Sequence, residues 1–257
     1  GDFAVGAIGQ DRLPGAGAEV LRSKSLDRNS YNSGDWFNKL DFSYTSNNWG
    51  VGLPPAQDNQ ANWPIMGPLL ANPALEPTPS DILDVSAHFL EMLAIRSSSR
   101  LFRLRTAGEI ASALRFENTG PAQIPGLIVL RLADATGAID RRSALIVALI
   151  NANDEAQTFP IPDLAGKALR LHPLQASSDD PVVRTSSFDM VTGTFIVPAR
   201  TASVFQLPRP VDAQIDLLIG DVDALVAAVA LKPGQGNALG SKQEAARRAV
   251  ASGDIQT

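Results

Sequence analysis

Short apolar runs separated by turn signals extend from residue 113 to 207. The runs LIVL (127–130) and ALIVALI (144–150) are apolar at consecutive positions, as in strands that are buried on both faces. Turn sequences such as Asn-Thr-Gly at 118–120 and Thr-Gly at 192–193 separate the runs. This spacing predicts an antiparallel β-sandwich in which the two apolar runs form central strands. The expected strands are 113–118, 126–133, 143–150, 156–160, 168–171, 181–189, 193–197 and 200–207.

Three segments precede this region. Residues 21–50 are polar, aromatic and rich in turn formers, which indicates a long ordered loop of the kind that often carries function. Seven prolines in residues 51–79 argue against a long helix or a central strand there, so we expect an irregular surface segment. In residues 80–97 apolar side chains recur at helical spacing, with Ser80 as the expected cap and Asp81 at the positive end of the helix dipole.

The end of the chain again shows helical periodicity. Apolar residues recur every three or four positions from 215 to 226, and Lys-Pro-Gly at 232–234 is expected to break that helix. A second helix is expected at 239–251. A hairpin of two such helices buries little apolar surface by itself.

Composition excludes several classes of function. With 257 residues and 44% hydrophobic content the chain can bury a real core, and its net charge of -5 argues against nucleic-acid binding. The absence of cysteine excludes disulfides and zinc-thiolate sites, and two histidines, His88 and His172, are too few for a multi-histidine metal site. We expect His88 to pack within its helix and His172 to be a satisfied loop residue. No cofactor is expected, calcium has no supporting motif, and no apolar run suits a membrane.

The best candidate chemistry lies in the sequence Ser-Gly-Asp-Trp-Phe-Asn-Lys at 33–39. The Asp35 carboxylate could accept hydrogen bonds from two neighbouring sugar hydroxyls, Trp36 offers a flat ring, and Lys39 supplies donors. A turn aspartate beside a core tryptophan would explain the same pattern. No Gly-x-Ser-x-Gly motif supports a serine nucleophile.

Several stretches resemble one known family. These are LRSKSLDRNSYNSGDWFNKLDFSY, NNWGVGLPP, NWPIMGPLLANP, RFENTGPAQIPGLIVL and TGTFIVPARTASVF, in order over about residues 15–207. They are similar to the end of pullulanase and limit-dextrinase type α-1,6-glucosidases, which are α-amylase-like glycoside hydrolases. The resemblance implies a mainly β chain: the end of a catalytic (β/α)8 barrel at 1–97, a C-terminal β-sandwich at 98–210 and a truncated helical extension at 211–257. Residues 1–14 do not match the expected barrel strand.

The resemblance also implies a function. The whole protein would be a starch-debranching enzyme that hydrolyses α-1,6 linkages in pullulan, limit dextrins and related α-glucans with retention. Its catalytic carboxylates would lie on earlier barrel strands, so this chain would hold no catalytic residue and be inactive alone. Lysine stands at 39 where many bacterial relatives have arginine, which replaces a rigid fork by a point charge. The implied substrate-binding residues are Asp35, Lys39, Trp36, Ser33, Tyr31 and Arg28.

Two other functions stay open at this point. The chain could be a non-catalytic carbohydrate-binding or structural β-sandwich module, or an interaction module that docks through its helical tail. The first residue is Gly1 rather than methionine, which leads us to expect a processed chain or a piece of a longer protein. The family further implies α-glucan or malto-oligosaccharide partners, with no nucleic acid or membrane, and a secreted or periplasmic location.

Overall fold

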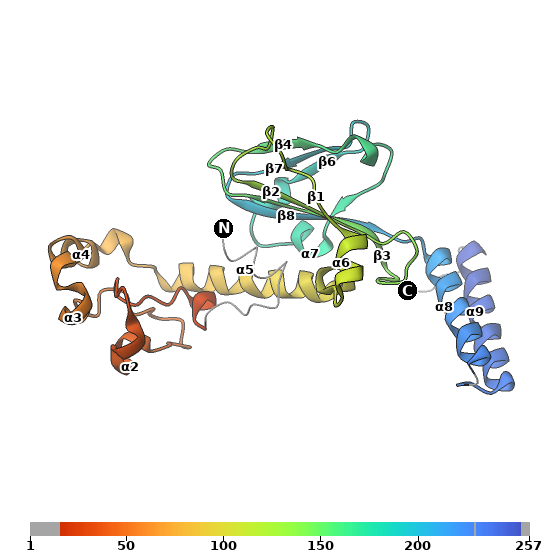
Figure 1. Ribbon diagram of the computed structural model, residues 1–257, viewed down its shortest axis with the longest axis horizontal. Helices are drawn as coiled ribbons and strands as arrows, with labels where there is room; N and C mark the ends of the chain where they lie inside the picture. The colour runs from red at the N-terminus through yellow and green to blue at the C-terminus, as the bar shows by residue number, and fades with distance from the viewer. Residues whose placement is uncertain (1–15, 229, 253–257) are drawn as a thin grey trace. The chain divides into compact units, whose positions relative to one another are not determined.

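The computed structural model describes residues 16–228 and 230–252 (Figure 1). The described chain divides between Ile95 and Arg96 into two compact units, and each is treated by itself below. The expectation that residues 1–14 are atypical concerns residues outside the described ranges.

The first unit consists of short helical turns followed by one long helix. Residues 51–79 form turns of helix rather than the expected irregular segment, and α4 contains two prolines, Pro64 and Pro68. Pro64 lies in the first turn, where its missing N–H would have no partner in the helix, so the helix tolerates it. The elements are η1 (Ala18–Val20), η2 (Ser30–Asn32), α2 (Gly34–Asn38), α3 (Ala56–Asn59), η3 (Gln60–Asn62), α4 (Trp63–Leu70), η4 (Pro73–Leu75) and α5 (Pro79–Ser98).

The long helix α5 confirms the helix expected at 80–97, but Ser80 is not its cap. The helix begins at Pro79, and the Thr78 hydroxyl accepts a hydrogen bond from the Asp81 N–H at 3.3 Å. The Asp81 carboxylate in turn accepts from the Thr78 N–H at 2.7 Å. This reciprocal pair is a capping box with proline at the first helical position, and it places the cap two residues earlier than predicted.

The second unit contains the expected antiparallel sandwich (Figure 1). A five-stranded sheet has the order β1-β2-β3-β8-β5, and a three-stranded sheet has the order β4-β7-β6. The prediction of central strands is confirmed, since β3 pairs with β2 on one side and β8 on the other. The strands are β1 (Leu114–Phe116), β2 (Leu127–Ala133), β3 (Ser143–Asn151), β4 (Gln157–Pro160), β5 (Arg170–Leu171), β6 (Ser187–Asp189), β7 (Thr194–Val197) and β8 (Thr201–Pro208).

Three expected strands are shorter in the structure: 113–118 is reduced to β1 and 168–171 to β5, and the largest change is at 181–189. Only β6 is extended, and the 3₁₀ turn η7 (Val183–Thr185) precedes it. The Asp180 carboxylate accepts from the Val182 N–H at 2.8 Å, and the Thr185 hydroxyl donates to the Val182 carbonyl at 2.7 Å. These local bonds offer the backbone an alternative to the sheet ladder, so the first half of the segment turns. The other short helices of this unit are η5 (Arg100–Arg103), α6 (Ala107–Ala113), η6 (Pro162–Leu164) and α7 (Pro173–Ala176).

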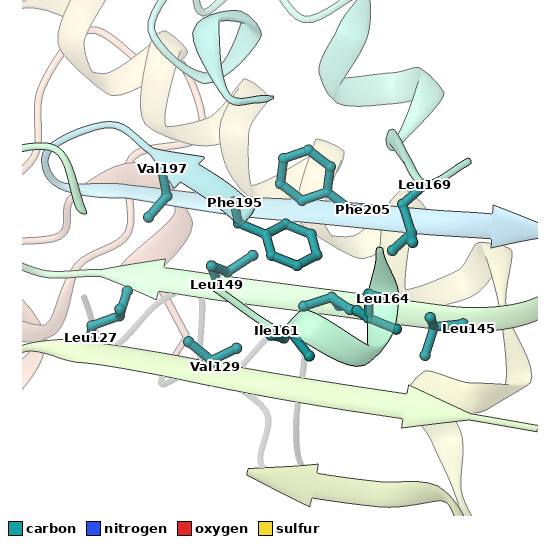
Figure 2. Close-up of a cluster of buried hydrophobic side chains, with 11 residues drawn as sticks. Leu127, Val129, Leu145, Leu149, Ile161, Leu164, Leu169, Phe195, Val197 and Phe205 are labelled. Carbon is teal, nitrogen blue, oxygen red and sulfur yellow. The ribbon is translucent and has the colours of Figure 1, made fainter. Parts of the chain in front are cut away.

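The sandwich core lies between the two sheets (Figure 2). Phe195 of β7 is fully buried, and its ring packs edge-on against Phe205 of β8 with ring centroids 5.1 Å apart. Phe188 of β6 approaches Phe195 from the same sheet, with ring centroids 4.6 Å apart. The aromatic pair therefore joins the two sheets directly.

Two buried carboxylates hold the turn between β2 and β3. Asp134 accepts hydrogen bonds from four backbone N–H groups of residues 136–140, at 2.8 to 3.2 Å. Asp140 accepts from the Ser99 hydroxyl and from the N–H groups of residues 100, 142 and 143. Burial alone would raise both pKa values, but these hydrogen bonds hold the pKa of each carboxyl below its ordinary value. Arg209, directly after β8, approaches Asp134 at 3.5 Å.

The chain ends in a helical hairpin, α8 (Val211–Ala227) and α9 (Pro233–Ser252). The prediction of a second helix from 239 is wrong by six residues, because Pro233 starts α9 rather than ending a helix. Proline suits the first helical position, and the Gln235 side chain accepts from the Lys232 N–H at 3.1 Å. The prediction of a mainly β chain is confirmed only in part, because the antiparallel sheets are present but the structure is 45% helical and 17% strand. None of the described helices is long and apolar enough to cross a membrane.

Candidate functional site

The loop at 21–50 presents a single helical turn, α2, with the predicted chemistry on it. Gly34 has a φ of 76°, so the chain turns into α2 through a backbone conformation that suits glycine. An open pocket of about 390 Å³ is lined by Asp35, Trp36, Asn38 and Lys39. The structure therefore brings three of the predicted residues together and adds Asn38.

The side chains of this pocket are available to a ligand. Within the described part of the chain, neither the Asp35 carboxylate nor the Lys39 ammonium group has a hydrogen-bond or ion-pair partner, and both residues are exposed. Trp36 is 64% exposed, which contradicts the explanation of this motif by a tryptophan packed in the core. An unpaired acid, an unpaired base and an exposed flat ring can bind a neutral, hydroxyl-rich ligand.

The other three predicted residues lie outside the pocket lining. Ser33 precedes α2, but its hydroxyl donates to the Asp27 carboxylate instead of capping the helix. Tyr31 is 87% exposed in η2. The Arg28 guanidinium approaches Asp58 at 3.6 Å in an exposed ion pair. A role for these three residues in substrate binding stays a prediction.

The backbone of the loop is unusual. Leu21, Ser25, Leu26, Tyr44 and Asn48 all have φ between 48° and 65°, the left-handed region that side chains with Cβ rarely adopt. Among the described residues only one further non-glycine position, Arg200, shares it. Such conformations persist only where the surroundings over-determine them, and they gather at functional sites.

Asn38 is the pocket residue that sequence reasoning missed. Its side-chain amide donates to the carbonyl oxygens of Ser30 at 2.9 Å and Gly34 at 3.0 Å. It therefore joins η2 to α2 as well as lining the pocket. Its position between Phe37 and Lys39 gave no signal, because asparagine is common in loops of every kind.

The expected structural roles of the two histidines agree with the structure. His88 lies half-buried in α5. His172 is buried, its Nδ1 accepts from the Leu174 N–H at 3.3 Å, and burial lowers its pKa. With Nδ1 accepting, Nε2 carries the proton toward the Ser98 hydroxyl 3.1 Å away, so this pair is not arranged to activate a nucleophile.

The comparison with protein families decides what kind of chain this is. Residues 44–208 match the family described as alpha-1,6-glucosidases, pullulanase-type, C-terminal. The chain belongs to this family. The resemblance seen in the sequence is therefore confirmed, and the match ends at the last residue of β8, before the helical hairpin.

Individual relatives agree with this assignment. Pullulanase 1, chloroplastic, of Arabidopsis thaliana is 51% identical over 196 residues, which are 74% of this chain and 20% of that protein. The crystal structure of PulA from Klebsiella oxytoca has a TM-score of 0.70 at 31% identity and covers 81% of this chain and 20% of that one. A maltotriose complex of PulA from Klebsiella pneumoniae has a TM-score of 0.68 at 34% identity, over 81% of this chain and 22% of that one. This chain thus spans about a fifth of the length of these relatives.

One acidic residue of this pullulanase-type chain, Asp27, has a structural role through its hydrogen bonds. Asp27 is partly desolvated, but hydrogen bonds from Ser33, Asn59 and the Asn29 N–H lower its pKa overall. Among residues 16–228 and 230–252, no three His, Asp or Glu side chains are grouped so that they could hold a metal ion.

Proposed function

We propose that this chain is the C-terminal part of a starch-debranching enzyme that hydrolyses α-1,6 linkages in pullulan, limit dextrins and related α-glucans with retention. In that enzyme the loop at 21–50 provides a sugar subsite and the β-sandwich supports it. The observation that carries the proposal is α2, which presents Asp35, Trp36 and Lys39 together, exposed and unpaired, in a chain of the pullulanase-type family.

The chemistry of the pocket fits a glucose unit. The two oxygens of the Asp35 carboxylate accept from vicinal hydroxyls, the Lys39 ammonium group donates to a hydroxyl or ring oxygen, and Trp36 covers an apolar face of the sugar. Lysine makes this contact as a flexible point charge, so Lys39 fixes the sugar less rigidly than an arginine would.

The proposal leaves the bond-breaking chemistry to the rest of the enzyme. Retaining hydrolysis uses two carboxyl groups about 5–5.5 Å apart on either side of the scissile bond. We assign these groups to barrel strands outside this chain. Residues 1–97 would be the end of that barrel, residues 98–210 the sandwich and residues 211–257 an extension. A barrel cannot close from so short a segment, so the chain alone should not hydrolyse pullulan.

The names of the relatives support an α-glucan substrate, since they are pullulanases and one was crystallised with maltotriose. They do not share one location: one relative is chloroplastic and others come from Klebsiella. A secreted or periplasmic location stays a prediction.

The test is a calorimetric titration of the chain with maltotriose. The wild-type chain should bind saturably, and Asp35→Asn should weaken binding about tenfold or more, because a hydrogen bond to a charged group contributes on the order of 1.5–3 kcal/mol. Asp84→Asn, the same change on an exposed face of α5, is the matched control and should bind like wild type.

The same titration separates the alternatives. If Asp35→Asn leaves the Kd for maltotriose unchanged, the sugar site would be assigned to the sandwich, which favours a carbohydrate-binding module. No binding by the wild-type chain would favour a purely structural sandwich. Release of maltotriose from pullulan by the pure chain would overturn the assignment of catalysis to other parts of the enzyme.

A further inference from the structure

We propose that two buried asparagines, Asn48 and Asn59, position α2 for sugar binding by holding it from opposite ends. Neither residue lines the pocket, so both would act through the backbone and side chains that present Asp35 and Trp36. The inference rests on the proposed function, because it assigns sugar binding to α2.

The need for external support follows from the length of α2. The helix has five residues, and the first four N–H groups and last four carbonyl groups of any α-helix lack partners within the helix. One turn of helix is also too short to be stable by itself in water. Exposed residues 35 and 36 can keep a fixed direction only if other parts of the loop hold the turn.

Asn59 supports the amino-terminal end of α2 through Asp27. The side chain is 2% exposed, and its amide donates to the Asp27 carboxylate at 2.9 Å and to the Pro55 carbonyl at 3.0 Å. Its own oxygen accepts from the Arg28 N–H at 3.1 Å. Asp27, held in this way, accepts a hydrogen bond from the hydroxyl of Ser33, the residue directly before α2.

Asn48 supports the carboxyl-terminal end. Its side chain is 7% exposed, and its amide donates to the carbonyl oxygens of Trp36 at 3.3 Å and Lys39 at 3.1 Å. Trp36 lies in the last turn of α2 and Lys39 directly follows the helix, so neither carbonyl group has an intrahelical partner. The φ of Asn48 is 65°, a conformation that asparagine tolerates better than most residues. Asn48 therefore adopts the left-handed backbone of this turn and also supplies the amide that bonds the end of α2.

The two contacts act on the residues of the pocket from outside it. Asn59 lies at the end of α3 and acts through Asp27, 32 residues earlier in the chain, whereas Asn48 bonds α2 directly. The Asn48 amide bonds the carboxyl-terminal end of this turn, whereas the Asn59 amide holds the carboxylate that bonds the residue before the turn. Loss of either amide should therefore let the turn move and change the directions of Trp36 and Asp35. Sugar affinity should then fall although no sugar-contacting group has changed.

The experiment uses the 257-residue chain and compares Asn59→Asp with Asn62→Asp. The first variant replaces the amide donor by a carboxylate facing Asp27, whereas the second adds the same charge at an exposed residue of η3. Two quantities are measured: the Kd for maltotriose, and the rate at which trypsin cleaves after Lys39. We expect Asn59→Asp to weaken binding at least tenfold and to speed cleavage at least tenfold, and Asn62→Asp to change each less than twofold.

A second variant guards against misfolding. Asn48→Gly keeps the left-handed backbone accessible but removes the donor, so the same two changes are expected for a local reason. The double substitution Asp27→Asn with Asn59→Asp restores an amide–carboxylate pair and should recover part of the affinity. The melting temperature of the sandwich should stay within about 2 °C in all variants, which excludes general unfolding.

The outcomes are distinct. The inference would be overturned if Asn59→Asp and Asn48→Gly behave like Asn62→Asp in both measurements. It would also be overturned if cleavage becomes faster while the affinity for maltotriose stays unchanged. If the wild-type chain binds no maltotriose, the proposed function fails, but the cleavage rates still decide whether these asparagines hold α2.

Discussion

The loop at 21–50 and the β-sandwich are stabilised by opposite means. The sandwich encloses an apolar core in which Phe195 and Phe205 join two sheets (Figure 2). Its strands exchange regular backbone hydrogen bonds. The loop leaves Trp36 and Tyr31 exposed and holds its backbone through side-chain amides and carboxylates. Five of its residues with Cβ adopt left-handed conformations.

The two kinds of stabilisation suit different tasks. Apolar burial is non-directional and tolerates exchange of similar side chains, so it suits a supporting domain. Directional hydrogen bonds from buried amides fix a backbone that has no regular ladder, and they leave the aromatic and charged groups free for a ligand. Substitutions in the two regions should therefore fail in different measurements.

The largest effect on stability should come from the sandwich core. Phe195→Ala removes a fully buried ring between the sheets and should lower the free energy of unfolding by about 3–5 kcal/mol. Urea unfolding followed by near-ultraviolet circular dichroism measures this. Phe116→Ala is the control, because that ring is 56% exposed and should cost far less. A loss below about 1 kcal/mol for Phe195→Ala would contradict the assigned core.

A matched pair of glycines compares the two regions directly. Gly193 and Gly34 have φ of 72° and 76°, so alanine at either site costs roughly 1–2 kcal/mol of backbone strain. At Gly193 the new Cβ would also lie 2.5 Å from the Ile161 carbonyl oxygen, whereas at Gly34 nothing lies within 4 Å. We expect a total of about 2–4 kcal/mol for Gly193→Ala. Equal losses in thermal unfolding would argue against the tight packing at Gly193.

The buried carboxylates of the β2–β3 turn predict a dependence of stability on pH. The pKa of Asp140 is below 3.8 in the folded state, so its hydrogen bonds stabilise the fold above that pH and are lost as pH falls through the lowered pKa. Asp140→Asn should cost about 1–3 kcal/mol at pH 7 and should make the decline of stability between pH 5 and pH 2 shallower. Urea midpoints across this range measure both, and parallel curves for the two proteins would contradict the assignment.

The smallest effect on stability, with a large effect on binding, should come from the exposed ring of the loop. Trp36→Ala should change the free energy of unfolding by less than about 0.5 kcal/mol but weaken maltotriose binding about tenfold, since truncating an aromatic contact commonly costs more than 1 kcal/mol. Trp63→Ala is its counterpart, because the Trp63 Nε1 donates to the Pro54 carbonyl at 2.9 Å. Trp63→Ala should therefore be destabilised. If Trp36→Ala instead lost stability and Trp63→Ala did not, the assignment of Trp36 to binding and Trp63 to structure would be wrong.

The sequence predicted the sandwich well because its signals are local and periodic. All eight expected strands exist, although those expected at 113–118, 168–171 and 181–189 are shorter. The largest difference lies before Ser187, where Asp180 and Thr185 form turns that apolar periodicity does not register. The errors at helix ends have one cause. Proline at 79 and at 233 was interpreted as a boundary or breaker, although it is well suited to the first helical position.

The loop was predicted only at the level of its motif. The motif indicated Asp35, Trp36 and Lys39, and the structure places them on one pocket. The contacts of Asn48 and Asn59 depend on which backbone groups lack partners in three dimensions, and no period or spacing in the sequence encodes that. The helical hairpin was expected, and its first helix was expected to expose an apolar stripe that includes Ile215 and Leu218. Leu218 is exposed, whereas Ile215 is buried.

The central proposal is that sugar binds to the loop at 21–50 and not to the sandwich. The most direct measurement is a titration of the ¹⁵N-labelled chain with maltotriose, followed by amide and indole NMR shifts. The account predicts saturable shifts of the Trp36 indole and of the amides of residues 34–39, with the β3 and β8 amides unchanged. No saturable shift at residues 34–39, or shifts confined to the sandwich, would contradict it.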